Sequence, residues 1–197
     1  MMSRAFFMVL SMVRAANKMI IFILLFYGPV SFGEVIISGL NGKILTTPEN
    51  GTDYSFYLVG HLYGAPENQL SSFPASSFLA NISLFNNTDI AFIVSLGDNY
   101  RRADSIHISN FENSVLKKIW RPFFNSVGNH DVSNRILYEK IFGQTYYSFQ
   151  YANELYICLD SEIRDEGLFE DQKEFLVSII ENAIEDNDIK NAFIFFL

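Results

Sequence analysis

Two glycine-containing polar turns, each placed directly after an apolar run, are the feature of the sequence that most restricts its fold. The apolar run at residues 90–96 is followed by Gly97 and Asp98, and the mostly apolar run at 122–127 is followed by the turn Gly-Asn-His-Asp at 128–131. Short apolar runs that end at such turns are typical of buried strands. Because open α/β sheets form their binding sites at the carboxyl ends of strands, the two turns predict one shared site.

The side chains of these turns are suited to binding metal ions. Asp98 offers carboxylate oxygens, Asn129 an amide oxygen and His130 an imidazole, which are ligands of hard and borderline cations. Asp131 follows His130 directly, and we expect it to fix the tautomer or the protonation of the imidazole. The glycines allow sharp turns and a close approach of a bulky ligand.

Strands and helices alternate along most of the chain, and this alternation predicts an α/β fold with a parallel sheet. The chain of 197 residues is 49% hydrophobic, which is sufficient for one domain with a core. The expected elements are strands at 35–37 and 54–60, a helical segment at 78–85, a strand at 90–96, a helix at 111–120, a strand at 123–127, a hairpin of 146–151 and 155–160, a helix at 169–184 and a strand from residue 192.

The two turns resemble the motifs of the calcineurin-like metallophosphoesterases, in which Gly-Asp and Gly-Asn-His-Asp/Glu occur in this order and at about this separation. The resemblance covers residues 54–197. It implies an αββα sandwich, in which two packed sheets carry metal-binding loops along one edge. It also implies that Asp98 bridges two divalent metal ions (Mn, Fe or Zn), that Asn129 binds one of them, and that His130 and Asp131 face the scissile phosphate ester.

The first motif of that family, Asp-x-His after the first core strand, has a variant form in this sequence. His61 stands in the place of the aspartate, and Tyr63 in the place of the histidine. Both side chains can bind metal, but the loss of a carboxylate changes the charge of the site and the metal that it prefers. The alternative is that both only form hydrogen bonds across the strand end. We take His61 as a candidate ligand, and Tyr63, Arg101 and Arg102 as weaker candidates for contact with the substrate.

The two later histidine motifs of the family have no counterpart in this sequence. The chain has three histidines, at positions 61, 107 and 130. Residues 191–197 form an apolar run that predicts a buried strand, and such a strand would lead into the first of the absent motifs. We therefore expect a sandwich that is incomplete at its carboxyl end. Residues 34–197 would be the truncated catalytic domain of a longer enzyme, inactive in this form.

Residues 1–33 differ in kind from the rest of the chain. Basic residues precede an apolar run at 19–27, and Ser31 and Gly33 provide the small residues of a cleavage site. The run is shorter than the roughly 20 residues that span a bilayer, which favours a cleaved secretory signal. The alternative is a membrane anchor, with membrane association through residues 5–32. Either segment predicts export to a periplasmic, extracellular or membrane-anchored location.

The charge of the chain restricts its partners. The formal net charge of −8 argues against a nucleic acid as the main partner, because binding to a phosphate backbone depends on Lys and Arg. Acidic charge near a metal site would instead attract cations. The expected partner is a phosphate-ester substrate. The single cysteine, Cys158, cannot form an internal disulfide, and its apolar neighbours predict a thiol packed in the core.

The sequence therefore predicts a metal-dependent hydrolase of phosphate esters. A dinuclear metal centre would activate a water for in-line attack on phosphorus, and His130, oriented by Asp131, would stabilise or protonate the leaving oxygen. The alternative prediction is a catalytically weak or inactive member of the fold that acts as a binding or assembly component of the cell envelope. In that case His61 and Tyr63 mark the decay of the first metal site.

Overall fold

The structure is a computed structural model of the whole chain, and it describes residues 8–15, 18–25, 35–46, 53–64, 71–163 and 170–197. The chain forms two compact units, Met1–Gly33 and Glu34–Leu197. In the first unit, strands β1 (Met8–Ala15) and β2 (Lys18–Leu25) pair in antiparallel fashion.

The export signal stays a prediction. Its small residues Ser31 and Gly33 lie outside the described residues. Within the described parts of the chain, no helix has both the length and the apolar character needed to cross a membrane.

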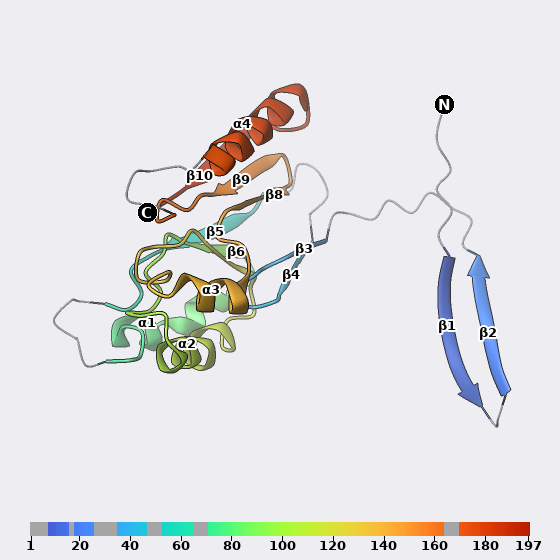
Figure 1. Cartoon of the computed structure of the whole chain (residues 1–197), viewed down its shortest axis with the longest axis horizontal. Coiled ribbons are helices and arrows are strands. Elements are labelled where there is room, and N and C mark those ends of the chain that lie inside the picture. Colours follow the sequence, from blue (N-terminus) through green and yellow to red (C-terminus); the bar gives the residue numbers. More distant parts are fainter. Residues whose placement is uncertain (1–7, 16–17, 26–34, 47–52, 65–70, 164–169) are drawn as a thin grey trace. The chain divides into compact units, whose positions relative to one another are not determined.

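The second unit is mixed α/β, with several sheets and, among its described residues, four α-helices (Figure 1). The expected α/β class is therefore confirmed. One sheet is parallel throughout and has the order β5 (Ser55–Val59), β6 (Ile90–Ser95), β7 (Phe123–Asn125). In the other sheet, β9 (Glu154–Cys158) lies between β10 (Asn191–Phe195), which is parallel to it, and β8 (Tyr147–Tyr151), which is antiparallel. Strands β3 (Val35–Ile37) and β4 (Ile44–Thr46) form a separate short hairpin.

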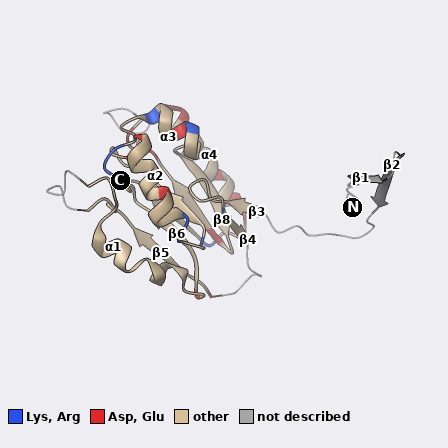
Figure 2. Ribbon diagram, turned by 90° about the horizontal axis from the view of Figure 1, so that it is seen from below, with Lys and Arg blue, Asp and Glu red and all other residues tan. Residues whose placement is uncertain are grey.

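The helices lie outside the two three-stranded sheets. They are α1 (Ser76–Ala80), α2 (Ser105–Phe111), α3 (Arg135–Phe142) and α4 (Glu170–Glu185), with a 3₁₀ turn at Ile82–Asn86 and a π-helical continuation of α2 at Glu112–Leu116. Polar side chains cap two of them: Asp104 accepts hydrogen bonds from the first amides of α2, and Asn134 from the Leu137 amide of α3. Helix α3 carries both basic and acidic residues, as its colouring in Figure 2 shows.

The two three-stranded sheets pack face to face through an aromatic core. The ring of Phe92 in β6 lies 5.0 Å from that of Tyr156 in β9, and the ring of Phe124 in β7 stacks at 4.1 Å on that of Phe149 in β8. All four side chains are at most 7% exposed. Aromatic pairs of this kind add about 0.5–1.5 kcal/mol each beyond the area that they bury, so this core fixes how one sheet lies on the other.

Helices cover the outer faces of both sheets. Because successive strand residues point to opposite faces, Ile93 points away from Phe92 and packs against the layer of α2 and α3, where Phe111 and Tyr138 are buried. On the other sheet, Ile157 packs against α4. The resulting order of layers is helices, sheet, sheet, helix, and Figure 1 shows α4 on the side of β8–β10.

Several elements differ from the expectation at their ends. Helix α2 begins at Ser105 rather than at residue 111, because the Asp104 cap starts it earlier. Strand β7 ends at Asn125 rather than at residue 127, and the turn begins at Asn129. Helix α3 and strand β4 were not expected. The Asn134 cap, followed by buried Tyr138 and Phe142 at a spacing of four, is the signal that would have indicated α3.

The Cys158 thiol is expected to be unreactive in the folded protein. Its side chain is fully buried, and burial raises its pKa to about 12. Since the thiolate is the reactive form, we expect alkylation near neutral pH to be about tenfold or more slower in the folded protein than in denaturant. Mass spectrometry of timed samples measures both rates. Equal rates would show that the thiol is accessible, contrary to this packing.

Candidate functional site

The candidate residues lie at the carboxyl ends of β5, β6 and β7, which meet at one edge because the three strands are parallel. Backbone hydrogen bonds hold the loops of this edge against one another. The His61 amide donates to the Gly97 carbonyl at 2.9 Å, and the Tyr63 amide donates to the Asp98 carbonyl at 3.4 Å. The loop after β5 is thereby aligned with the loop after β6.

His61 and Asp98 share an unusual backbone conformation. Each directly follows a glycine that lies just beyond the end of its strand, and each has a φ of 56°, in the left-handed region that few residues other than glycine adopt. Residues with strained backbones cluster at functional sites. At this edge the two side chains meet. Nδ1 of His61 lies 3.2 Å from Oδ2 of Asp98, with the imidazole half exposed and the carboxylate almost fully buried.

Two glycines allow the loops after β6 and β7 to approach closely. A Cβ atom at Gly97, which has a φ of 97°, would lie 2.5 Å from the Gly128 backbone nitrogen. A Cβ atom at Gly128 would overlap Oδ1 of Asp98 and lie 2.7 Å from Cδ2 of Leu197. No side chain fits at either position without moving the Asp98 loop.

Asp131 joins these two loops from inside the protein. Its carboxylate is fully buried and accepts hydrogen bonds from the amides of Asp98 (2.7 Å), Asn99 (3.0 Å) and Gly128 (3.0 Å). Burial, together with the nearby Asp98 charge, raises the pKa of Asp131 to about 6. The hydrogen bonds from the three amides act in the opposite direction. The Asp131 carboxylate therefore holds the loop after β6 against the turn after β7.

The expectation that Asp131 orients the His130 ring is corrected by the geometry of the ring. Nδ1 of His130 lies 2.6 Å from the Arg101 carbonyl oxygen, and Nε2 lies 3.3 Å from the Tyr63 hydroxyl. Both oxygens of Asp131 are engaged by backbone amides. The side chains of adjacent residues in a turn point in different directions, so that His130 faces the site while Asp131 faces the interior.

Tyr63 and Arg101 complete the group of side chains around His130. The Tyr63 ring lies 4.6 Å from the ring of His130 and 4.3 Å from that of His61. The Arg101 guanidinium lies 5.0 Å from the centre of the Tyr63 ring. Burial and the Asp98 charge raise the pKa of Tyr63, and Arg101 opposes this rise. The structure thus brings together five of the expected residues: His61, Tyr63, Asp98, Arg101 and His130.

The remaining expected residues lie at the surface of the same loops. Asn129 is exposed on the turn between Gly128 and His130, and Arg102 is exposed one residue beyond Arg101. Neither side chain is buried in the group formed by the other five. Their positions are compatible with contact to a ligand that approaches from solvent.

A buried polar network behind the site was not expected. The Ser95 hydroxyl donates to the Asn99 side-chain oxygen at 2.7 Å, the Asn99 amide donates to Asn125 at 2.9 Å, and the Asn125 amide donates to the Tyr138 hydroxyl at 3.1 Å. Polar residues at the ends of otherwise apolar strands, Ser95 and Asn125, are the signal that would have indicated it. The network ties the Asp98 loop to β7 and α3.

A second unexpected contact joins α3 to the end of β9. Arg135 donates to the fully buried carboxylate of Asp160 at 2.6 Å, and a side-chain oxygen of Gln172 accepts from the Asp160 amide. Burial lowers the pKa of Arg135, but the bond to Asp160 and the nearby acidic charges outweigh this effect and raise it. The carboxylate of Asp160 is thereby engaged in a structural ion pair.

The separation of His61 and Asp98 fits two ligands of one metal ion. Two ligand atoms at about 2.0–2.2 Å from the same ion are about 3.0–3.4 Å apart, and the observed distance is 3.2 Å. The amide of Asn129 is a further oxygen donor of a suitable kind. Within residues 35–46, 53–64, 71–163 and 170–197, and the described strands before them, no group of three or more His, Cys, Asp or Glu side chains could hold an ion.

No family model and no curated protein matches this chain. The functional assignment therefore depends on the geometry of the strand-end loops and on the chemistry of their side chains.

Proposed function

We propose that the protein is a metal-dependent hydrolase of phosphate esters. The observation that carries this proposal is the pair of His61 and Asp98. Both residues have a left-handed backbone at neighbouring strand ends, and Nδ1 of His61 lies 3.2 Å from Oδ2 of Asp98. The His130 backbone amide donates to the other oxygen of Asp98. Support also comes from the order of layers, which is the order that an αββα sandwich of the calcineurin-like metallophosphoesterases would have.

The residues that would hold divalent metal are Asp98, His61 and Asn129. Oxygen and imidazole donors suit Mn, Fe or Zn. The chemistry that such ions supply is polarisation of the phosphoryl group and activation of water. Asp98 is held for this role by its backbone and by the His130 amide, which donates to Oδ1 at 3.3 Å. That bond leaves Oδ2 on the side of His61.

His130 is the candidate for proton transfer to the leaving oxygen. Its Nδ1 is occupied by the Arg101 carbonyl at 2.6 Å, so exchange of a proton would take place at Nε2, where the Tyr63 hydroxyl lies 3.3 Å away and would share this nitrogen with the leaving oxygen. The positive charge of Arg101, on the loop after β6, favours the approach of a phosphate group.

The second candidate function is a catalytically inactive binding component. The observation that favours it is the incomplete set of metal ligands: the described residues contain no group of three or more His, Cys, Asp or Glu side chains around one point. A site with two such ligands holds metal weakly unless further donors complete it.

Assays of the purified full-length protein decide between the two candidates. An activated phosphate diester and a monoester are incubated with Mn²⁺, Fe²⁺ or Zn²⁺, and parallel samples contain a chelator. Hydrolysis that requires metal supports the proposed hydrolase. Metal binding without hydrolysis supports the binding component, and the absence of both overturns the metal site itself.

Replacing His61 by glycine is expected to weaken metal binding about tenfold or more, because one ligand is lost. Glycine tolerates the φ of 56° at this position, so the fold should be at least as stable as before. Isothermal titration with Zn²⁺ measures the affinity, and thermal unfolding checks the fold.

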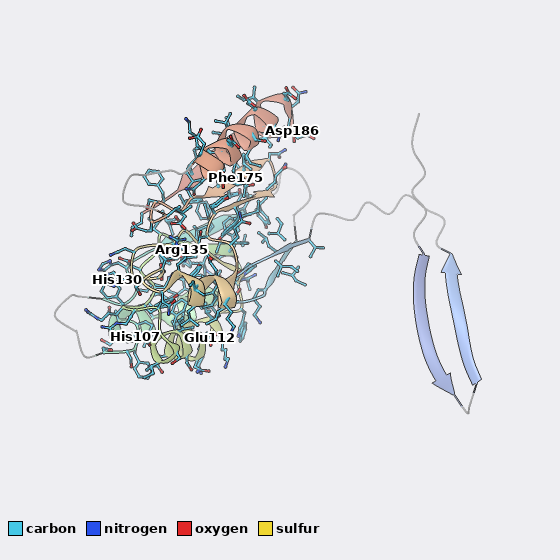
Figure 3. The ribbon with its side chains drawn as sticks, viewed as in Figure 1. His107, Glu112, His130, Arg135, Phe175 and Asp186 are labelled. Atoms are coloured by element: carbon cyan, nitrogen blue, oxygen red, sulfur yellow. The ribbon has the colours of Figure 1, made fainter. Side chains whose placement is uncertain are left out.

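The matched control is the replacement of His107 by alanine. His107 pairs with Asp104 at the start of α2 and is labelled apart from His130 in Figure 3. Its loss should leave the metal affinity unchanged. If both variants bind Zn²⁺ as the parent protein does, His61 is not a ligand.

A further inference from the structure

We propose that Tyr63 is a positioning residue for His130 and not a metal ligand. Its hydroxyl holds Nε2 of the imidazole, while the Arg101 carbonyl holds Nδ1. The catalytic meaning of this role rests on the proposed hydrolase, but the contacts that carry it are properties of the fold.

The backbone of Tyr63 is fixed by the loop on both sides. Its amide donates to the Asp98 carbonyl, the Gly64 amide donates to the His61 carbonyl at 3.2 Å, and the Ala75 amide donates to the Leu62 carbonyl at 2.7 Å. The side chain is buried, with the whole residue 6% exposed. Tyr63 therefore has little freedom to turn toward another partner.

The partners of His130 determine which of its nitrogens carries the proton. A carbonyl oxygen only accepts hydrogen bonds, so Nδ1, at 2.6 Å from the Arg101 carbonyl, must be the protonated nitrogen. In the neutral imidazole Nε2 is then an acceptor. The Tyr63 hydroxyl, 3.3 Å away, is the donor that Nε2 requires.

The direction of the Tyr63 hydroxyl separates this role from metal ligation. A ligand in this loop would direct its oxygen to the point between His61 and Asp98. The hydroxyl instead contacts His130, and the flat ring packs between the two imidazoles at 4.3 and 4.6 Å. Tyr63 thus replaces a metal-binding side chain by one that fixes the ring of the proton-transfer residue.

Loss of the hydroxyl would leave the His130 ring held at one nitrogen only. The ring could then tilt about its bond to the Arg101 carbonyl, and Nε2 would no longer have a fixed place. Small displacements of a reacting group lower a rate strongly without a matching change in substrate binding. The effect should therefore be on kcat rather than on KM.

Replacing Tyr63 by phenylalanine removes only the hydroxyl and keeps the ring contacts. The chain has three histidines, so their ring nitrogens can be resolved by NMR of protein labelled with ¹⁵N-histidine. In the metal-free parent protein we expect His130 to be protonated at Nδ1 with Nε2 accepting a hydrogen bond. In the variant the Nε2 resonance of His130 should move while Nδ1 stays protonated. The amount of bound Zn²⁺ should be unchanged. The kcat for phosphate-ester hydrolysis should fall about tenfold or more, with KM retained.

Replacement of Tyr57 by phenylalanine is the control. Tyr57 lies on β5 and its ring packs at 5.1 Å on Phe85, so the same chemical change is made away from His130. The proposal is overturned if the parent His130 carries its proton on Nε2, if its resonances are the same in parent and variant, or if the variant loses bound Zn²⁺. A parent protein that hydrolyses no phosphate ester overturns the proposed function instead, and the spectra of the metal-free protein still decide the role of Tyr63.

Discussion

Replacing Asp98 by asparagine lowers the rate of phosphate-ester hydrolysis by about a thousandfold, which corresponds to about 4 kcal/mol of transition-state stabilisation. The substitution removes a negative charge at the point where Oδ2 lies 3.2 Å from His61. Asparagine has the same size and tolerates a left-handed backbone, and its oxygen can still accept from the His130 amide. The loss should therefore come from the missing charge, with the fold retained. Steady-state assays with saturating Mn²⁺ measure the effect.

The control for this substitution is Asp104 replaced by asparagine. Asp104 lies in the same loop but caps α2, a role that asparagine performs equally well. The rate of this variant should equal that of the parent protein.

Replacement of Asn129 by alanine should lower the rate, as the Asp98 substitution does, since it removes an expected ligand. A variant of Asp98 that retains the parent rate would eliminate this carboxylate from the mechanism.

Replacing Asp131 by asparagine should lower the free energy of unfolding by about 3 kcal/mol. Three backbone amides point at the carboxylate, two at Oδ2 and one at Oδ1. In either orientation of the new amide, its NH₂ group faces at least one of these donors, and a buried amide is left without an acceptor. Removal of the costly buried charge offsets part of the loss, as the raised pKa of Asp131 indicates. Denaturation in urea measures the change.

The exposed Asp171 provides a comparison for this stability effect. It lies in the first turn of α4, where an acidic residue interacts favourably with the helix dipole. Its replacement by asparagine should cost less than about 1 kcal/mol. If the Asp131 and Asp171 variants lose equal stability, the three amides do not depend on the Asp131 carboxylate.

The strand ends and the residues placed there could be predicted from the sequence. Glycine turns after apolar runs are local signals, and parallel strands necessarily bring their carboxyl ends to one edge. For this reason His61, Asp98 and His130 were expected near one another, and in the structure the His61 ring and the His130 backbone amide both contact the Asp98 carboxylate. The burial of Cys158 followed equally from its apolar neighbours.

The roles of Asp131 and Tyr63 could not be predicted, because they depend on directions rather than on positions along the chain. Adjacency in sequence suggested that Asp131 serves His130, whereas its carboxylate turns inward to amides from two loops. The partners of the His130 ring are the Arg101 carbonyl and the Tyr63 hydroxyl, and the latter is 67 residues away on a loop with a different motif. Helix α3 was missed because only two of its residues, Tyr138 and Phe142, are buried.

The matched backbone of His61 and Asp98 has a consequence for how such a site can evolve. Each residue follows a glycine and has the same φ of 56°, so both positions favour the same small set of residues: glycine, asparagine, aspartate and histidine. All but glycine in that set carry an atom able to bind a cation. If the proposed metal site is correct, single substitutions within the set would alter its metal selectivity with little cost to folding.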